Sequence, residues 1–280
     1  MAVSSMDALR VLTTNCWNVS PPFEPRSELL RAEIERLQPD VIGLQEIIVR
    51  ADGLDMAQMI LDGLGYEWVY GSAQMWGEDG KPQPGAGAAT GFGNAVASRY
   101  PIVRSCVEQL PDAGSGEYRS ATMTIIDAPC GPLLFATTHL NWKFHHGFVR
   151  EQQVLALAEL IERWRSEVYL PPILVGDLNA DPDSAEVRFL CGMQSLNGRS
   201  CFFEDAWRVG GGSGPGFTWD NKNPFAAMVS EPNRRLDYIL VGLPYENGRG
   251  RIEDCRLAMA DAHNGIYPTD HFGLFAELRV

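Results

Sequence analysis

Short runs of apolar and β-branched residues recur along the whole chain and constrain its fold more than any other feature of the sequence. Each run is bounded by Pro, Gly, Asp or Asn, which is typical of strands in a buried sheet. Two amphipathic segments between the runs, at 27–38 and 148–165, predict helices. Many strands with few helices predict two packed sheets with helices on the outside. The predicted strands lie at 9–13, 41–44, 66–70, 94–98, 122–126, 133–137, 173–175, 238–241 and 272–278.

The chain shows no internal boundary between domains. Two segments rich in Gly and Pro, at 71–91 and 209–216, predict surface loops, and neither separates two self-sufficient cores. We therefore expect a single domain over residues 1–280.

Cysteine spacing and hydropathy indicate the compartment. The six cysteines are widely spaced and include no C-x-x-C pair, which favours buried free thiols over a disulfide or zinc framework. The first ten residues lack the basic and apolar regions of a secretory signal, and no apolar stretch is long enough to span a bilayer. We expect a cytoplasmic protein without a transmembrane segment, present as a monomer.

The net charge limits the class of protein. The chain has 23 basic and 36 acidic residues, which gives a net charge of −13. Because affinity for the phosphate backbone comes from Lys and Arg, a protein that coats nucleic acid is excluded. An enzyme acting on nucleic acid is not, since a bound divalent ion can reverse the local field.

Polar residues with catalytic potential fall at the ends or starts of the predicted strands. The end of one strand and the start of its antiparallel neighbour lie on the same edge of a sheet. Six separate segments can therefore deliver side chains to one place. The residues are Asn15, Glu46, His139, Asp177 with Asn179, Asp237, and Asp270 with His271.

These side chains suit one kind of chemistry. The carboxylates and amides are hard oxygen donors, which select Mg²⁺, Mn²⁺ or Ca²⁺ over zinc. His139 and His271 add groups that exchange a proton near neutral pH. Oxygen ligands with histidines indicate metal-assisted phosphoester hydrolysis. Each residue alone also has a structural interpretation, as a turn former, helix cap or solvated carboxylate, and spacing does not decide between the two.

Seven strings in fixed order carry a family resemblance. They are TTNCWN (13–18), PDVIGLQEI (39–47), GNAVASRYPI (93–102), ATTHLNW (136–142), LVGDLNADPDS (174–184), RRLDYILV (234–241) and PTDHFGLFAEL (268–278). Together they resemble the endonuclease/exonuclease/phosphatase superfamily, whose members include deoxyribonuclease I, AP endonucleases and neutral sphingomyelinases. The resemblance spans nearly the whole chain and implies a deoxyribonuclease I-like α/β fold, a four-layer α/β/β/α sandwich with two central mixed sheets flanked by helices.

The resemblance also implies a role for each site residue. The metal, Mg²⁺ with Mn²⁺ as a substitute, would be bound by Glu46, Asn15 and Asp270. The catalytic residues would be His139, Asp177, Asn179, Asp237 and His271. Within this set, Asp237 and His271 resemble the family's Asp–His dyad. We expect His271, oriented by Asp237, to activate the water, with Asp177 as the alternative base.

The motifs are less specific for the substrate. We expect a phosphodiesterase acting on nucleic acid or nucleotides, with Arg119, Asn141 and Trp219 as candidate substrate contacts. The stretch GFTWDNKNP (216–224) resembles sphingomyelinases, so hydrolysis of phospholipids or small phosphodiesters is the alternative. The aromatic and basic segment 143–146 suits single-stranded nucleic acid, a nucleotide or a lipid head group, and is equally explained as a solvated loop.

Overall fold

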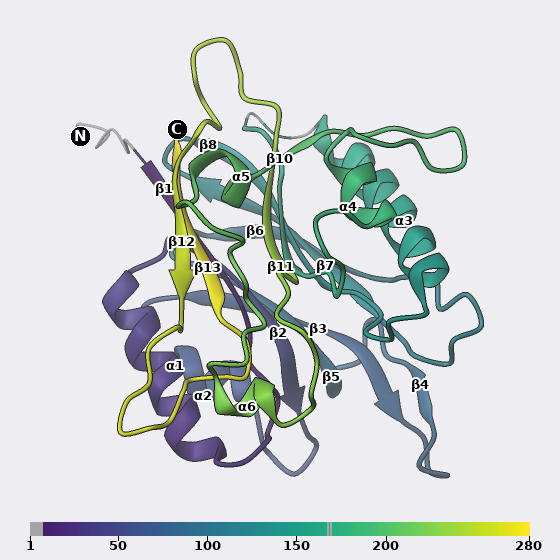
Figure 1. Ribbon diagram of the computed structural model, residues 1–280, viewed down its shortest axis with the longest axis vertical. Helices are drawn as coiled ribbons and strands as arrows, with labels where there is room; N and C mark the ends of the chain where they lie inside the picture. The colour runs from purple at the N-terminus through teal and green to yellow at the C-terminus, as the bar shows by residue number, and fades with distance from the viewer. Residues whose placement is uncertain (1–7, 167, 169) are drawn as a thin grey trace.

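Two mixed β-sheets pack face to face at the centre of the computed structural model, which describes residues 8–166, 168 and 170–280 (Figure 1). The expectation about a secretory signal rests mainly on residues 1–7, which lie outside the described residues.

The first sheet contains both ends of the described chain. The strand β1 (Ala8–Asn15) lies at its centre, antiparallel to β13 (Gly273–Arg279) and parallel to β2 (Val41–Val49). The full order is β12 (Ile252–Ala258), β13, β1, β2, β5 (Gly91–Ser98), β3 (Glu67–Trp76) and β4 (Pro82–Pro84).

The second sheet is built from the middle of the chain. Its central strands are β8 (Gly131–His139) and β9 (Ile173–Asp177), which run parallel. The full order is β10 (Phe203–Asp205), β11 (Asp237–Gly242), β9, β8, β7 (Ser120–Ala128) and β6 (Ile102–Gln109).

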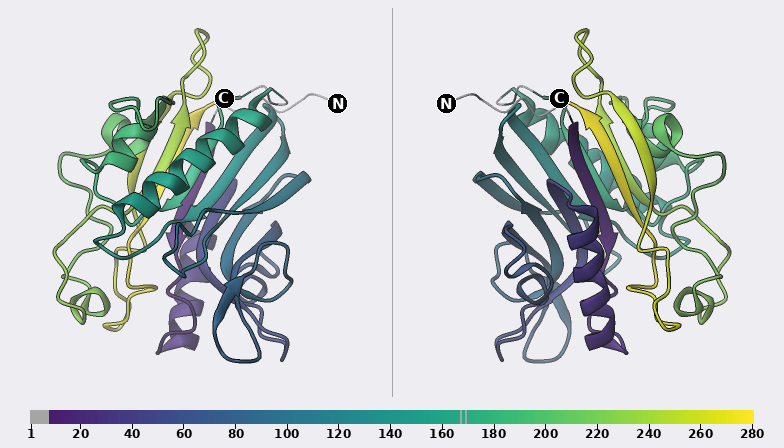
Figure 2. Two further views of the ribbon diagram at one scale, coloured as in Figure 1. Left: turned by 90° about the vertical axis from the view of Figure 1, so that its right-hand side faces the viewer. Right: turned by 90° about the vertical axis from the view of Figure 1, so that its left-hand side faces the viewer.

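Helices cover the outer face of each sheet. The helices α1 (Phe23–Leu37) and α2 (Met56–Leu61) pack on the first sheet, and α3 (Gly147–Arg165) and α4 (Ala185–Leu190) pack on the second. Figure 2 shows α1 and α3 on opposite sides of the molecule. Two short helices, α5 (Ala206–Gly210) and α6 (Pro224–Ala227), lie in connections. The predicted four-layer α/β/β/α sandwich is therefore confirmed.

The layer between the sheets changes character along the strands. Apolar side chains such as Val11, Phe135 and Val175 fill most of it. Nearer the carboxyl end of β1 the layer becomes polar, because Gln45 Nε2 donates to the hydroxyls of Thr137 at 2.8 Å and Thr13 at 3.1 Å. The fully buried bond to Thr137 joins the two sheets, and the bond to Thr13 links neighbouring strands of the first sheet.

Three predicted boundaries are wrong. Residues 71–76 continue β3 rather than forming a loop, since Gly71 and Ser72 pair with Asn94 and Gly93 of β5. Residues 82–84 form β4 at the sheet edge, where a proline's missing N–H costs no ladder bond. The first helix begins at Phe23, four residues before its predicted start at residue 27. The strands β6, β10 and β12 and the four short helices were not among the predicted elements.

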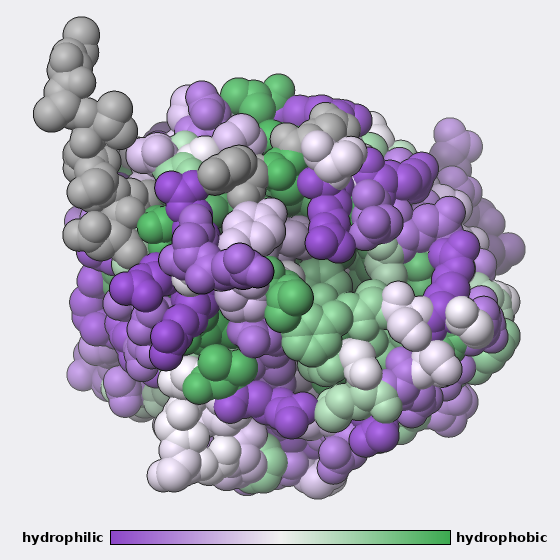
Figure 3. All heavy atoms as spheres, turned by 90° about the horizontal axis from the view of Figure 1, so that it is seen from above, coloured by the Kyte–Doolittle hydropathy of each residue, from purple (hydrophilic) through white to green (hydrophobic). Residues whose placement is uncertain are grey.

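An apolar groove lies at the end of the molecule shown from above in Figure 3. Its cavity has a volume of about 1040 Å³ and is lined in part by Phe202, Tyr245 and the Pro171–Pro172 pair. Pro172 precedes β9 and Gly242 ends β11, so the groove lies at the opposite ends of these strands from Asp177 and Asp237. Among the described residues, no helix is both long and apolar enough to cross a membrane.

Candidate active site

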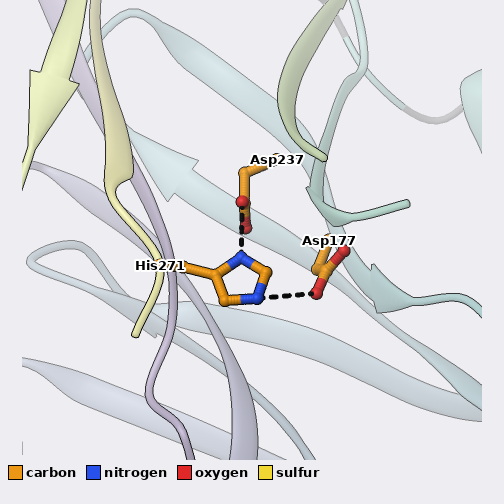
Figure 4. A group of neighbouring side chains, drawn as sticks. All are labelled: Asp177, Asp237 and His271. Carbon is orange, nitrogen blue, oxygen red and sulfur yellow. Dashed lines mark hydrogen bonds and ion pairs between the residues drawn. The ribbon is translucent and has the colours of Figure 1, made fainter. Parts of the chain in front are cut away.

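Strand pairing places three of the predicted catalytic residues side by side. His139 at the end of β8 is in register with Asp177 at the end of the parallel strand β9. Asp237 at the start of β11 is in register with the same Asp177. His271, just before β13, enters from the first sheet and lies between the two aspartates (Figure 4). The edge shared by these strands is therefore the centre of the candidate site.

Both ring nitrogens of His271 face carboxylates. Its Nδ1 lies 2.8 Å from Asp237 Oδ2, and its Nε2 lies 3.8 Å from Asp177 Oδ2. Burial alone would lower the pKa of His271, but Asp237 and Asp177 together raise it well above its usual value. The ring is therefore held as an imidazolium with a donor on each side.

The backbone on both sides of Asp177 holds its side chain in place. Gly176 precedes it with a φ of 142°, and a Cβ on Gly176 would lie 1.9 Å from the carbonyl oxygen of Thr138. Only glycine permits this close approach of β8 and β9. The Oδ1 atom of Asp177 accepts a 2.8 Å hydrogen bond from the backbone N–H of Asn179. Burial raises the pKa of Asp177 to about 6, with the carboxylate of Asp237 adding to the shift.

The first sheet contributes Asn15 and Glu46. The register of β2 against β5 shifts between Leu44 and Ile47, and Glu46 has a left-handed φ of 58° at this bulge. A bulge turns one extra side chain out of the alternation of a strand. Gln45 can therefore point between the sheets while Glu46 faces the site.

The amide of Asn15 joins the two halves of the site. Its Nδ2 donates to Glu46 Oε1 at 3.2 Å and to Asp177 Oδ2 at 3.0 Å. Its Oδ1 accepts from the backbone N–H of Trp17 at 2.9 Å. Because a backbone N–H can only donate, this last bond fixes which amide atom is oxygen. Asn15 thus presents its nitrogen to both carboxylates, and its role as a metal ligand stays a prediction.

Asp270 completes the acidic wall of the site. Burial and the nearby carboxylate of Glu46 raise its pKa to about 7. The hydroxyl of Thr269 donates to the carbonyl oxygen of Asn15 at 2.7 Å and lies 3.2 Å from Asp270 Oδ1. Asp270 is therefore fixed against the end of β1, near Glu46.

The donor set fits a divalent cation. The carboxylates of Asp177, Asp237 and Asp270 all act on the charge of His271, and burial together with the repulsion from Glu46 raises the pKa of Asp270. Within the described part of the chain, Asp177, Asp237 and His271 form a group whose ligand atoms lie within 4.8 Å of one another. The ring nitrogens of His271 already face carboxylates, so Glu46 and Asp270 offer the more accessible oxygen donors.

His139 differs from His271 in its electrostatics. Its Nε2 lies 3.4 Å from Asp177 Oδ2, and its buried Nδ1 has no hydrogen-bond partner among the described residues. Burial lowers the pKa of His139 well below its usual value, and the charges of Arg119 and His271 lower it further. His139 is therefore a neutral ring at neutral pH, with one nitrogen directed at Asp177.

Arg119 and Asn141 share one carboxylate. Glu117 forms an ion pair with the guanidinium of Arg119, whose Nε donates at 2.6 Å, and accepts from Asn141 Nδ2 at 2.8 Å. The buried Nη1 of Arg119 has no partner within the part of the chain that the structure describes. A buried guanidinium N–H without an acceptor is costly, so this donor is suited to an anionic ligand.

Asn179 bonds Asp177 through its backbone N–H, and Trp219 packs against the ring of His271. Asn179 has a left-handed φ of 49° and donates from Nδ2 to the carbonyl oxygen of Leu140 at 3.1 Å. The ring of Trp219 meets that of His271 edge-on, with 5.0 Å between centroids. Trp219 is 8% exposed, so it supports His271 from behind, and its contact with substrate stays a prediction.

Two residues important for the site were not predicted. The buried guanidinium of Arg26 donates to the carbonyl oxygens of Cys16, at 3.1 Å, and Pro268, at 3.2 Å. Arg26 thus ties the segment after Asn15 to the segment before Asp270. No motif marks it, because an arginine in an amphipathic helix normally lies on the solvent face.

The second is Asn223, which is fully buried. Its Nδ2 donates to the carbonyl oxygens of Thr269 at 2.8 Å and Asp270 at 3.1 Å, and its Oδ1 accepts from Phe225 N at the start of α6. Its position before a proline predicts only a helix cap. Asn223 is a positioning residue for Asp270.

A comparison with protein families decides the classification. Residues 12–271 match the model of the Endonuclease/Exonuclease/phosphatase family. The chain belongs to this family. Its members hydrolyse phosphoesters, and the chain is accordingly a phosphoester hydrolase. No curated protein sequence matches the chain at a significant level.

Solved structures of similar fold cover nearly the whole chain. Humanized D. rerio TDP2 has a TM-score of 0.72 and 18% identity over 98% of this chain and 99% of its own. D. rerio TDP2 complexed with a single strand DNA product has a TM-score of 0.70 and 19% identity, over 98% and 99%. The human Nocturnin catalytic domain with bound sulfate has a TM-score of 0.67 and 22% identity, over 97% and 93%. At these identities the likeness shows the fold.

Proposed function

We propose that the chain is a Mg²⁺-dependent phosphodiesterase acting on nucleic acid or nucleotides. One observation carries this proposal. Asp177 is the meeting point of Asn15, His139, Asp237 and His271, which come from four different strands or strand edges. Oxygen donors, a neutral imidazole and an imidazolium gathered at one buried carboxylate suit in-line attack of water on a phosphodiester.

The carboxylates of Glu46 and Asp270 would hold the metal, with Asn15 beside them. A bound Mg²⁺ would supply stabilisation of the charge that develops on the phosphoryl and leaving oxygens. The amide of Asn15 spans the distance between this position and Asp177, because its Nδ2 bonds Glu46 and Asp177 at once.

Asp177 is the better placed group to accept a proton from the attacking water. His271 faces a carboxylate at each nitrogen and is therefore a donor in this arrangement. This arrangement supports Asp177, the alternative base of the sequence analysis, over His271. His271 would then donate a hydrogen bond to a phosphoryl oxygen. Asp237 keeps His271 in that state through its 2.8 Å bond to Nδ1.

The remaining polar groups would bind the phosphate. We assign this role to the amide of Asn179, the ring of His139 and the unpartnered Nη1 of Arg119. In comparable sites, a donor to the non-bridging oxygens, the role we assign to Asn179 and His139, contributes about 3 kcal/mol to transition-state stabilisation. Asn141, held by Glu117 next to Arg119, would contact the same phosphate or its neighbour.

Nucleic acid is the favoured substrate for two reasons. The fold is that of D. rerio TDP2, which has been seen with a single strand DNA product. The buried guanidinium of Arg119 also suits a substrate in which further phosphates flank the scissile phosphate. Residues 1–280 would form a single catalytic domain for this reaction.

Nicking of supercoiled plasmid and cleavage of a labelled single-stranded oligonucleotide test the proposal. We expect wild-type protein to cleave at least one of them with Mg²⁺ and to lose this activity in EDTA. His271→Ala should lower kcat by at least about 100-fold with an unchanged melting temperature. Hydrolysis of sphingomyelin but of neither nucleic acid would instead assign the chain to lipid phosphodiesters. An unchanged kcat in His271→Ala would contradict the assigned site.

A further inference from the structure

Three aromatic rings project into solvent from one short segment beside the site. The 142–148 segment, WKFHHGF, links the end of β8 to the start of α3. Trp142 and Phe144 are each 52% exposed, and Phe148 is 65% exposed. Between them lie Lys143 and two histidines, and the segment contains no carboxylate. In a chain with 13 more acidic than basic residues, this composition is unusual.

The backbone of this segment is held from beneath. The buried Arg150 donates from Nη1 to the carbonyl oxygens of Asn141, at 3.2 Å, and Lys143, at 2.8 Å. The Oδ1 atom of Asn141 accepts from Lys143 N at 3.2 Å and lies 3.0 Å from His146 Nδ1. The rings are therefore presented on a fixed backbone, which reduces the conformational entropy that a ligand must remove on binding.

The segment adjoins the proposed phosphate-binding groups on two sides. The guanidinium of Arg234 lies 4.4 Å from the centre of the Phe144 ring and donates to the carbonyl oxygen of Asn179 at 3.3 Å. On the other side, Asn141 bonds Glu117, the partner of Arg119. A chain of nucleotides leaving the site over this edge would pass directly across Trp142 and Phe144.

We infer that the 142–148 segment binds unpaired bases of single-stranded nucleic acid next to the scissile phosphate. Trp142 and Phe144 stack on successive bases, and Lys143 contacts the phosphate between them. Exposed aromatic rings with interspersed cations are the recurrent means of binding single strands without sequence preference. Membrane-surface binding typically uses an amphipathic helix with a long apolar face, whereas residues 142–146 precede α3 and carry only two of the exposed rings.

This inference rests on the proposed function, and binding can be measured apart from catalysis. The probe is a fluorescein-labelled single-stranded 15-mer of dT, titrated in EDTA and followed by anisotropy. Trp142→Ala and Phe144→Ala should each weaken binding about tenfold, and Trp142→Phe should restore most of the loss. Phe202→Ala is the matched control, since Phe202 is 48% exposed but lies before β10, next to the distant groove. It should bind like wild type.

Removing the bases from the probe tests stacking directly. A 15-mer of abasic sites should bind wild type about as weakly as dT binds the doubly substituted Trp142→Ala/Phe144→Ala protein. Both substitutions should then have little further effect on the abasic probe. With Mg²⁺, the KM for the oligonucleotide should rise in the variants by more than the KM for bis(4-nitrophenyl) phosphate.

The outcomes separate this inference from the proposed function. If wild-type protein binds dT and neither Trp142→Ala nor Phe144→Ala weakens this binding, the inference is overturned, even if the oligonucleotide is cleaved. Binding that depends on the rings supports it, even if no cleavage occurs and the proposed function fails. The inference is also overturned if the protein co-sediments with sphingomyelin–phosphatidylcholine vesicles and Trp142→Ala abolishes this while leaving the binding of dT unchanged.

Discussion

The Nδ1 atom of His271 lies 2.8 Å from Oδ2 of Asp237, and both side chains are buried. The two residues come from different sheets, since Asp237 begins β11 of the second sheet and His271 lies two residues before β13 of the first. The bond therefore depends on the packing of the two sheets against each other. It fixes the orientation of the imidazole ring and its charge at the same time, because Asp237 raises the pKa of His271 against the effect of burial.

Neutralising the carboxylate of Asp237 should impair catalysis without unfolding the chain. In Asp237→Asn the amide can still bond the ring, but it no longer favours the charged form of His271. The corresponding change in a serine-protease triad lowers kcat by about 10⁴-fold, and we expect roughly 10²- to 10⁴-fold here. Steady-state kinetics on an oligonucleotide, with the melting temperature as a control, measure the effect. A kcat within a few-fold of wild type would mean that Asp237 is only structural.

Loss of the Asn223 side chain should weaken the metal site. Asn223→Ala removes two hydrogen bonds to the backbone of the segment that carries Asp270. Outer partners of metal ligands typically contribute about 10- to 100-fold in affinity. The Mg²⁺ concentration for half-maximal activity should therefore rise by about tenfold or more. Asn221→Ala is the control, because the side chain of Asn221 bonds the carbonyl oxygen of Glu231 and Oδ1 of Asn233, away from Asp270. An equal rise in both variants would count against a specific role for Asn223.

Replacing Arg119 with lysine should raise KM more than it lowers kcat. The substitution keeps the positive charge but removes the planar fork that Glu117 orients and whose Nη1 is unpartnered among the described residues. A hydrogen bond to a charged group contributes about 1.5–3 kcal/mol, which corresponds to about 10- to 100-fold in KM. Arg36→Lys on the exposed face of α1 serves as the control. If Arg119→Lys leaves KM unchanged, Arg119 does not contact the substrate.

His139 should make the fold sensitive to acid. Burial and the charge of Arg119 hold its pKa well below 6.5 in the folded chain, whereas the unfolded chain protonates near pH 6.5. The unfolded state therefore binds more protons as the pH falls below about 6.5, and the stability that is present above this pH is lost. The limiting slope is about 1.4 kcal/mol per pH unit.

Urea unfolding at pH 7.5, 6.5 and 5.5 in EDTA isolates this effect. Relative to His139→Gln, wild-type protein should lose about 1 kcal/mol in its free energy of unfolding between pH 6.5 and 5.5. Titrating groups that do not contact His139 are common to both proteins and cancel in the difference. Parallel pH profiles for the two proteins would show that His139 is not held neutral in the folded chain.

The sequence predicts the strands that are buried on both faces and misses those at the edges. The strand β9 begins with a short apolar, β-branched run that is buried throughout and bounded by proline and aspartate. The edge strand β6 alternates weakly, because several of its residues face solvent. In β12 a bulge between Ile252 and Asp254 breaks the alternation of apolar and polar residues. The three-residue strands β4 and β10 are too short for any pattern to be visible.

Much of the candidate site is predictable from the sequence, because its residues lie at the ends of predicted strands. Residues at strand ends, such as Asp177 and Asp237, meet because strand register fixes which ends are neighbours. Arg26 and Asn223 act through backbone carbonyl oxygens. Such contacts depend on how loops approach one another and leave no periodic signal. Likewise, the amide orientation of Asn15 depends on the backbone N–H of Trp17, which only the folded chain brings into place.

The central claim is that Glu46 and the Asp177–His271 pair together make a metal-dependent phosphodiesterase. The most direct test is hydrolysis of bis(4-nitrophenyl) phosphate by EDTA-stripped protein to which Mg²⁺ is added back, with wild type and Glu46→Gln in parallel. The account predicts no hydrolysis in EDTA, recovery in wild type on adding Mg²⁺, and a half-maximal Mg²⁺ concentration at least about tenfold higher in Glu46→Gln. Hydrolysis by wild type that persists in EDTA, or a Mg²⁺ response that is identical in Glu46→Gln, would contradict it.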